Sequence, residues 1–423
     1  MSELAGLSDQ NVRYESRRSP VYARNGIVST TQPLAAQAGL QVLRAGGNAA
    51  DAAVATAAAL AVVEPTGTGI GGDCFALFFD ASTKQVHAVN GSGRAPAGLS
   101  IEALSERGFE GETLGQGVHA VTVPGAVAGW ADTLARHGRL GLSEVLAGAI
   151  ALAEDGFPVS PIISYLWEQE VPKTLAASPN SGELLIDGRA PRPGEIWRNA
   201  GLASVLREIA EGGAAAYYEG RAAEEIVRAL QAQGGLMEGS DLVGHVSTFE
   251  PPVSTTFRGH TVYECPPNGQ GLTALMALNI IEGLDIEGTA RRSPERLHLL
   301  IEAVRVAFSQ ARAHIADPEH GEVPVDWLLS DGLSSELRSW IEPERRIDLA
   351  EGLPLEVGTD TVYLSVVDGD GNACSFINSN YNGFGTAIIP EGCGFPLQNR
   401  GAGFSLDPTH PNALAPGKRP YHT

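Results

Sequence analysis

The chain has 423 residues, 43% of them hydrophobic, so it is long and apolar enough to bury a large core. Its 29 Lys and Arg residues against 50 Asp and Glu residues give a net charge of -21, which disfavours binding to nucleic acids and to anionic membranes. The four cysteines form no C-x-x-C pair, so neither a zinc knuckle nor a redox motif is indicated.

The first 25 residues carry charges but no apolar segment of the kind found in signal peptides. We therefore expect an N-terminal arm over residues 1–25, a single domain over residues 26–423, and a cytoplasmic protein. The longest apolar stretch, Ala52–Val63, is too short to span a bilayer.

The first elements of the domain have clear boundaries. Gly26–Thr31 is expected to be a strand. Pro33–Arg44 is predicted as a helix, because a proline stands in its first turn and two glycines follow it. Asn48 is a suitable cap for a second helix, Ala49–Val63. This second helix consists almost entirely of Ala and Val, so it is expected to pack closely against a sheet in the core.

Further elements are predicted in the middle of the chain. They are a strand at Cys74–Phe79, helices within Gly125–Gly156, two helices within Ala200–Gly234, a strand at His260–Cys265, and helices at Leu272–Glu282 and Pro294–Ala316.

Near its end the chain changes character. Glu342–Val357 is polar and without periodicity, which predicts an exposed loop. Thr361–Asp368 and Ala373–Asn380 then alternate as two strands, joined by a turn at Gly369–Asn372.

Several short stretches match known functional motifs only in part, because the flanking elements or key residues that those motifs require are missing. Gly67–Gly72 fits G-x-G-x-x-G, but a helix precedes it and a strand follows, the reverse of a dinucleotide site. A tight turn is the better interpretation of Gly67–Gly72.

Asp368–Asn372 resembles the start of an EF-hand loop, yet position 12 would be Ser379 instead of Glu, so a hairpin turn is expected. H-E-x-x-H and G-x-S-x-G are both absent, which leaves a metalloprotease and an α/β-hydrolase unsupported.

Matching stretches throughout the chain resemble the γ-glutamyltranspeptidase family in order and spacing. They are Leu34–Ala55, Glu64–Phe75, Val123–Trp130, Ala149–Val159, Cys265–Gly283, Glu302–Pro318, Asp360–Phe376 and Asn412–Pro420.

The resemblance implies an α+β fold, the four-layer αββα sandwich of N-terminal-nucleophile hydrolases. It also implies a precursor that cuts itself before a Thr. Thr361, four residues before Ser365–Asp368, matches that position. The bond cut would then be Asp360–Thr361, with residues 1–360 as the large subunit and residues 361–423 as the start of the small one.

The reaction that the resemblance implies needs only the hydroxyl of Thr361 as nucleophile and the α-amino group of the same residue as base. A Thr hydroxyl is a poor nucleophile at neutral pH unless a base takes its proton. After the cut, the new α-amino group has an ordinary pKa of about 7.7–8.0 and can serve as that base. No cofactor is implied.

The substrate-binding positions depart from those of glutathione-cleaving members. In those members an Arg that opens R-x-x-A-P binds the α-carboxylate of the substrate. Ser92 occupies that position here, and Arg94 is displaced by two residues. The Asp that binds the α-amine there is Gly403 in this chain.

Two more positions differ. The Gln before that Asp has become Arg400, next to Asn399, and an Asn on the second strand has become Tyr381, two residues after Ser379. This pattern is closer to the divergent branch with glutathione-hydrolase-like proteins, oxamate amidohydrolases and cephalosporin acylases. It favours a small amide substrate with a carboxylate held by Arg400, with Arg94 as a substitute from a shifted loop. The alternative is that Arg400 pairs with a local acid.

The chain stops at Thr423, whereas small subunits of the family run further and carry the paired glycines of the oxyanion hole. We therefore expect a fragment truncated at the C-terminus, or a protein that is inactive as given. A non-enzymatic relative with a binding role is the competing class. The expected partners are a small-molecule amide and the two subunits of the precursor, with a homodimer left open.

Overall fold

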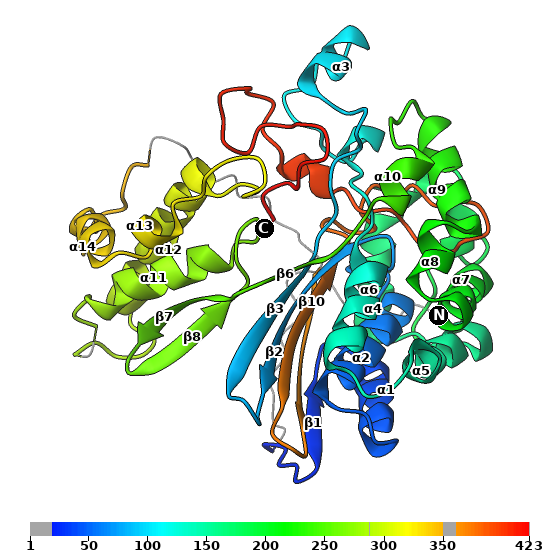
Figure 1. Cartoon of the computed structure of the whole chain (residues 1–423), viewed down its shortest axis with the longest axis horizontal. Helices are drawn as coiled ribbons and strands as arrows, with labels where there is room; N and C mark the ends of the chain where they lie inside the picture. The colour runs from blue at the N-terminus through cyan, green and yellow to red at the C-terminus, as the bar shows by residue number, and fades with distance from the viewer. Residues whose placement is uncertain (1–18, 287, 350–360, 423) are drawn as a thin grey trace, which may run out of the picture.

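The computed structural model describes residues 19–286, 288–349 and 361–422 (Figure 1). A six-stranded antiparallel sheet runs through the middle, in the order β1-β9-β10-β2-β3-β6. The two strands nearest the C-terminus, β9 and β10, therefore lie between β1 and β2, which come from the N-terminal part of the chain. Their bounds are β1 Gly26–Ser29, β2 Asp73–Asp80, β3 Gln85–Gly91, β6 Thr248–Glu250, β9 Val362–Asp368 and β10 Ala373–Ser379.

Strand register determines which residues meet at one end of this sheet. Val362 of β9 pairs with Asn378 of β10, so the preceding Thr361 lies beside Ser379. Ser379 in turn pairs with Asp73 at the start of β2. Three polar side chains that are distant in sequence are thus brought to the same end of three adjacent strands.

Helices cover one face of the sheet (Figure 1). The helix α2, Ala49–Val63, is buried at every residue and packs on α1, Pro33–Arg44, and on β9 and β10. Small side chains make this close approach possible. Asn48 caps α2 in a capping box with Asp51, and both helices have the predicted bounds. The helices α4, Ala126–His137, and α5, Leu142–Asp155, lie within the range predicted to be helical, and both pack against α2.

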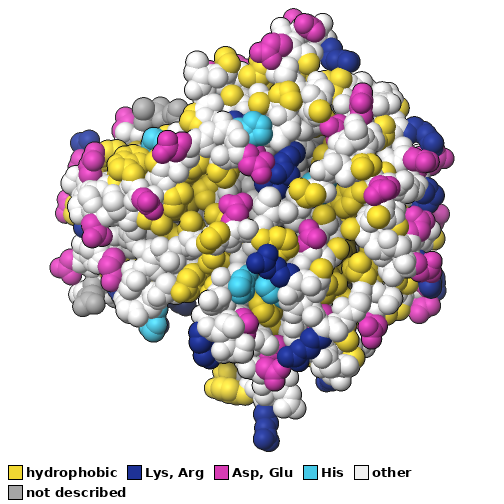
Figure 2. Space-filling view, viewed as in Figure 1, with side chains coloured by type: hydrophobic (Ala, Val, Ile, Leu, Met, Phe, Trp, Pro, Cys, Tyr) yellow, Lys and Arg dark blue, Asp and Glu magenta, His cyan; other side chains and the backbone are white. Residues whose placement is uncertain are grey.

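A second unit lies beyond the other face of the sheet (Figure 1). The hairpin of β7, Val253–Phe257, and β8, His260–Glu264, packs against α11, Gly271–Glu282, which contacts α12, Pro294–His314. Cys265 joins this unit to the sheet, because its Sγ donates to the carbonyl of Ala76. Figure 2 shows hydrophobic side chains gathered over the α11–α12 region and acidic side chains spread over the same face.

The remaining elements are mostly short. They are α3 Ile101–Glu106, α6 Pro161–Glu170, α7 Ala200–Gly212, α8 Ala214–Tyr218, α9 Arg221–Gln231, α10 Gly239–Val243, α13 Val325–Leu328, α14 Asp331–Ser339, the strands β4 Phe157–Pro158 and β5 Ile196–Trp197, and the 3₁₀ turns η1 Val118–Ala120, η2 Leu175–Ala177, η3 Ser181–Leu184 and η4 Arg400–Gly403.

Three of these helices fall where two were predicted, within Ala200–Gly234. Gly213 has a φ of +73° and separates α7 from the short α8. Such a backbone angle ends a helix, and the sequence pattern alone did not reveal the extra break.

Both predicted turns are confirmed. Gly67–Gly72 links α2 to β2 as a tight turn. A Cβ on Gly71 would lie 2.2 Å from the carbonyl oxygen of Pro396, and one on Gly72 would lie 2.2 Å from that of Ser379. Asp368–Asn372 closes the β9–β10 hairpin, where the Asp368 N–H donates to the carbonyl of Asn372 at 3.0 Å.

Other predictions extend past the described residues. Residues 19–25 of the predicted arm are exposed and have no helix or strand, and residues 1–18 lie outside the described part. Of the loop predicted at Glu342–Val357, residues 342–349 are described and contain neither helix nor strand beyond an isolated bridge. Among the described residues, no helix has both the length and the apolar character needed to cross a membrane.

Candidate active site

Thr361 stands at the entrance to β9, with its side chain exposed. Its Oγ1 lies 2.9 Å from Oγ of Ser379, and that Oγ accepts the backbone N–H of Tyr381 at 2.9 Å. The Ser379 hydroxyl is therefore held in place beside Thr361 and can share a proton with it. Asp360 lies outside the described residues.

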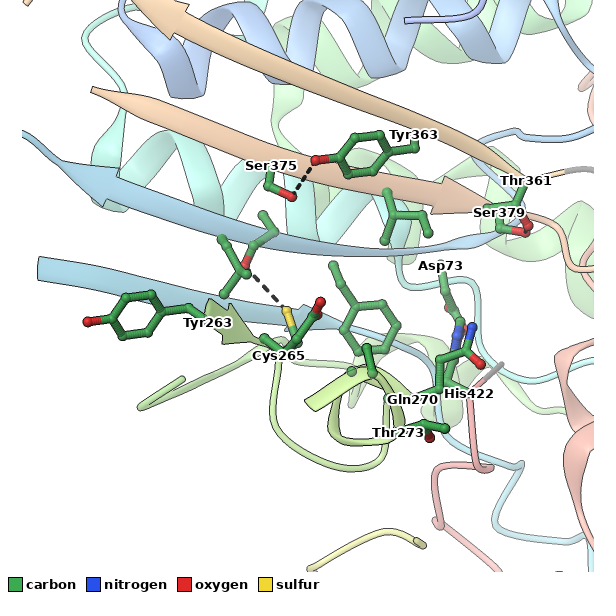
Figure 3. A pocket seen from close by; sticks show the side chains of 18 of the residues that line it. Asp73, Tyr263, Cys265, Gln270, Thr273, Thr361, Tyr363, Ser375, Ser379 and His422 are labelled. Carbon is green, nitrogen blue, oxygen red and sulfur yellow. Dashed lines mark hydrogen bonds and ion pairs between the residues drawn. The ribbon is translucent and has the colours of Figure 1, made fainter. Parts of the chain in front are cut away.

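A pocket of about 740 Å³ opens beside these residues, between the sheet and the β8–α11 segment. The side chains of Thr361, Ser379, Asp73 and His422 lie at one end of the pocket, which we call its polar end (Figure 3). Arg400 also lines the pocket. The rest of the lining comes from β2, β8, β9, β10, α11, α12 and the segment between β8 and α11. It combines apolar side chains with the polar side chains of Tyr263, Glu264, Tyr363 and Ser375.

Arg400 brings a buried positive charge to this pocket. It begins η4 and is 1% exposed. Its guanidinium carbon lies 4.2 Å from the centroid of the Tyr381 ring, a cation–π geometry. Burial lowers the pKa of Arg400 to about 10, while the charge of Asp73 acts in the opposite direction. The side chain is therefore positively charged at neutral pH.

Asp73 and His422 form a buried pair at the same end of the pocket. Nε2 of His422 lies 3.1 Å from Oδ2 of Asp73. Burial is the main cause that lowers the pKa of His422 to about 4. The charge of Arg400 lowers it further, and the bond to Asp73 opposes both. The imidazole is therefore neutral at neutral pH.

The predicted binding residues fall into two groups. Ser379 and Arg400 line the pocket, and Tyr381 stacks on Arg400. Ser92, Arg94 and Asn399 are not part of its lining.

Those three side chains make other contacts. Ser92 is buried and donates its hydroxyl to Oδ1 of Asn90 at 2.6 Å. Arg94 forms a two-pronged ion pair with Glu319 at 2.9 and 3.0 Å. Asn399 accepts the N–H of Asn382 at 3.1 Å.

Sequence reasoning missed Asp73 and His422. Asp73 follows directly on the glycine turn, and His422 follows the matched stretch Asn412–Pro420. Each residue therefore lies in or next to a stretch that matches the family. Nothing in the sequence places the two side chains together, because their contact depends on the strand register and on the path of the last residues. The described residues contain no group of three or more His, Cys, Asp or Glu side chains placed to hold a metal ion.

Comparison with known proteins identifies the class. The model of the gamma-glutamyltranspeptidase family matches residues 35–423. The chain is 42% identical over 397 residues to the glutathione hydrolase-like YwrD proenzyme of Bacillus subtilis, covering 92% of this chain and 73% of that protein. It is 36% identical over 408 residues to the oxamate amidohydrolase proenzyme of Klebsiella pneumoniae, covering 94% and 75%.

Solved structures agree. The crystal structure of a cephalosporin acylase from Bacillus halodurans superposes with a TM-score of 0.87 at 45% identity, covering 98% of this chain and 77% of that one. The protein belongs to the γ-glutamyltranspeptidase family of amidohydrolases, which confirms the predicted α+β N-terminal-nucleophile fold and the likeness to the divergent branch. The chain spans about three quarters of the length of these relatives.

Proposed function

We propose that this protein is a self-processing amidohydrolase that uses Thr361 as its nucleophile and acts on a small amide whose acyl group carries a carboxylate. One observation carries the proposal: Thr361 and the buried cation Arg400 line the same pocket. The hydroxyl supplies the attacking atom, and the guanidinium supplies a fixed partner for an anion.

The proposed reaction follows from the position of Thr361. Its α-amino group, once free, takes the hydroxyl proton while Oγ1 attacks the amide carbonyl. The C–N bond then breaks, and the leaving amine departs with that proton. Water hydrolyses the resulting ester on Oγ1 and restores the hydroxyl. Ser379, 2.9 Å away, steadies Oγ1 through its own hydroxyl.

Self-processing supplies the free amine. Two of the relatives are named proenzymes, which supports a cut at Asp360–Thr361. In the precursor, Oγ1 of Thr361 attacks the carbonyl of Asp360 and the peptide nitrogen is released as the α-amine. Water then cleaves the ester and separates residues 1–360 from residues 361–423. Before that step the base is tied up in a peptide bond, so the precursor is inactive.

The choice of an anionic acyl group rests on the surroundings of Arg400. Its charge is buried, and a buried guanidinium offers an anion a strong, weakly screened interaction. Arg94, the alternative cation, is paired with Glu319 and is not part of the pocket lining. Relatives named for glutathione, oxamate and cephalosporin chemistry define the substrates to screen.

Intact mass spectrometry and N-terminal sequencing of the protein, purified after expression from its complete gene, test the processing step. We expect a fragment that begins Thr-Val-Tyr-Leu, and a single uncut chain for Thr361→Ala. Thr83→Ala, at an exposed turn, is the matched control and should be cut normally. An uncut wild-type chain contradicts the proposal.

Matched amides test the acyl preference. Glutaryl-p-nitroanilide carries a terminal carboxylate, and pentanoyl-p-nitroanilide has the same chain length without it. We expect Arg400→Ala to lower kcat/KM for the glutaryl amide by about 10²-fold or more, since truncating one side of a buried charge pair costs several kcal/mol. The pentanoyl amide should change little. Equal losses on both amides contradict the assignment of Arg400.

A further inference from the structure

The last described residues, 419–422, form a buried segment that carries His422 to the polar end of the pocket (Figure 3). No helix or strand runs through this segment, and only His422 takes part in an isolated bridge, with Gly269. A buried peptide group needs a hydrogen-bond partner, so an irregular buried segment depends on partners that other parts of the chain supply. The place of the His422 ring therefore depends on those partners.

Asn268, in the loop between β8 and α11, holds this segment at two points. Its side-chain Nδ2 donates to the carbonyl of Pro420 at 2.8 Å, and its backbone carbonyl accepts the N–H of His422 at 2.9 Å. The two bonds lie on either side of Tyr421, so together they fix the register of the segment. Asn268 is fully buried and is not part of the pocket lining. It therefore acts on the pocket only through the residues that it holds.

The orientation of the Asn268 amide follows from a buried relay of Asn90, Ser92 and Asn268. The backbone N–H of Ser92, which can only donate, meets Oδ1 of Asn90 at 3.0 Å. Nδ2 of Asn90 then donates to Oδ1 of Asn268 at 2.9 Å. This leaves Nδ2 of Asn268 for Oγ of Ser92 at 3.2 Å and for the carbonyl of Pro420, which can only accept. The contact with the last segment therefore requires an N–H donor at position 268.

We propose that Asn268 is a positioning residue of the candidate active site, which acts through the last segment and sets the place of the His422 ring at the polar end of the pocket. The activity measurements below rest on the proposed function, because they concern the same pocket. Position 268 precedes the proposed cut and residues 419–422 follow it, so this contact joins the two pieces of the processed protein.

Asn268→Asp tests the donor, because the two side chains have the same shape. At neutral pH the carboxylate has no N–H, so two acceptor oxygens face each other at Pro420. We expect kcat/KM for glutaryl-p-nitroanilide to fall by about tenfold to hundredfold, from one unsatisfied buried contact and a displaced ring. Self-processing should be unchanged, because the contact between Thr361 and Ser379 lies outside the relay.

Asn199→Asp is the matched control. Asn199 is also buried, and its Nδ2 also donates to the backbone carbonyl of a distant residue, Gly394, at 2.7 Å. It caps α7 and is not part of the pocket lining. This variant loses the same kind of bond, so it should lose stability in urea but keep the wild-type kcat/KM. Similar losses of activity in both variants would indicate general destabilisation and contradict a positioning role.

The pH profile tests for the donor itself. Burial raises the pKa of a carboxyl introduced at position 268, and its protonated form can donate to Pro420. The charge of Asp73 acts in the same direction, whereas Arg419, whose Nε donates to the carbonyl of Ser92 at 3.1 Å, opposes the rise.

The activity of Asn268→Asp relative to the wild-type protein should therefore recover in acid. We expect the ratio of the two kcat/KM values to rise as the pH falls from about 8 to about 5. Asn268→Ala has no donor at any pH, so its ratio to the wild-type value should stay constant. Parallel profiles for the two variants contradict the required donor.

NMR of protein labelled with ¹⁵N-histidine reports on the ring without any turnover. His422→Gln assigns the His422 signals by their loss. We expect these signals to shift in Asn268→Asp and to stay in place in Asn199→Asp. Unshifted His422 signals in Asn268→Asp overturn the inference, whatever the activity.

Asn90→Asp reaches the same contact through the relay and decides the question if Asn268→Asp does not fold. Its carboxylate still accepts the N–H and the hydroxyl of Ser92, but it presents an oxygen to Oδ1 of Asn268. The Asn268 amide then turns or loses a bond, which weakens its hold on Pro420. We expect the same loss of activity and the same shift of the His422 signals. Wild-type activity and signals in this variant contradict the relay.

The proposed function and the role of Asn268 fail differently. A wild-type protein, expressed from its complete gene, that cleaves no p-nitroanilide and leaves Asp360–Thr361 intact contradicts the proposed function. Normal processing and amide cleavage, with unshifted His422 signals in Asn268→Asp, contradict only the role of Asn268.

Discussion

At the scale of residues, the polar end of the pocket combines opposite charges that are both withdrawn from water. Arg400 is 1% exposed, and Asp73 is buried and influences its pKa. Burying either charge alone would be costly, whereas opposite charges with satisfied hydrogen bonds offset part of that cost. Tyr381 adds the face of its ring to the guanidinium. The pocket is thereby preorganised for a polar acyl group before any substrate enters.

His422 gives this arrangement a pH dependence that stability measurements can detect. The ordinary pKa of 6.5 is lowered to about 4 in the folded protein, first by burial. As the pH falls below 6.5, the His422 ring becomes protonated in the unfolded protein but stays neutral in the folded protein until the pH approaches about 4. Unfolding is then coupled to proton uptake, so stability is lost between pH 6.5 and about pH 4.

The variant His422→Gln should remove this contribution. We expect its free energy of unfolding, from urea titrations at each pH, to fall less steeply over that window than the wild-type value. The difference in slope should approach about 1.4 kcal/mol per pH unit, which corresponds to one proton. His137 and His245, whose pKa values are also lowered to about 4, act in both proteins and cancel. Parallel curves would contradict the prediction.

At the scale of elements, the glycine turn between α2 and β2 positions the segment before Arg400. The carbonyl of Gly71 accepts the N–H of Gln398 at 3.0 Å. A Cβ on Gly71 would meet the backbone oxygen of Pro396 at 2.2 Å, a distance that real Cβ contacts do not show. The turn and the segment of residues 396–398 therefore fit together only because this residue has no side chain.

Gly71→Ala tests that fit. We expect a loss of about 1–3 kcal/mol in the free energy of unfolding, the usual range for an extra methyl group in a packed site. The shifted segment carries Gln398 and Arg400, so kcat/KM for the glutaryl amide should fall as well. Gly321→Ala is the control, because nothing lies within 4 Å of its Cβ and its φ is not in the left-handed region. Equal stability of the two variants would contradict the prediction.

The elements also show what a sequence can predict. The helices α1 and α2 were predicted with correct bounds, because Pro33 and Asn48 mark their starts by local chemistry. No strand was predicted at Gln85–Gly91, where the polar His87 and Asn90 obscure the pattern of β3. That strand is defined by its pairing with β2 and β6.

The residues of the candidate site also differ in whether a local sequence pattern indicates them. Thr361 could be predicted as the nucleophile from the sequence because it belongs to a local stretch that resembles a family motif. The contact between Asp73 and His422 joins residues 349 positions apart, so no local pattern indicates it. Such contacts depend on strand register and on the path of the final loop, and neither is encoded in a short window of sequence.

At the scale of the whole molecule, the proposed cut would divide a sheet without opening it. The strands β9 and β10 follow Thr361, yet they lie between β1 and β2, which precede it. Side chains also cross the division: the indole N–H of Trp130 donates to Oδ1 of Asn378 at 3.0 Å, and Asp73 binds Gln398 and His422. The two pieces therefore share one core and one ladder of backbone hydrogen bonds.

The processed protein should consequently remain a single particle. We expect size-exclusion chromatography with light scattering to give the same native mass for the cut wild-type protein and for uncut Thr361→Ala, although denaturing electrophoresis separates two fragments only for the wild type. In urea, the fragments should part at the concentration at which circular dichroism reports loss of the sheet, because removing β9 and β10 would leave the edges of β1 and β2 unpaired in the core. Fragments that separate in buffer, or at urea concentrations that leave the sheet signal intact, would contradict a shared core.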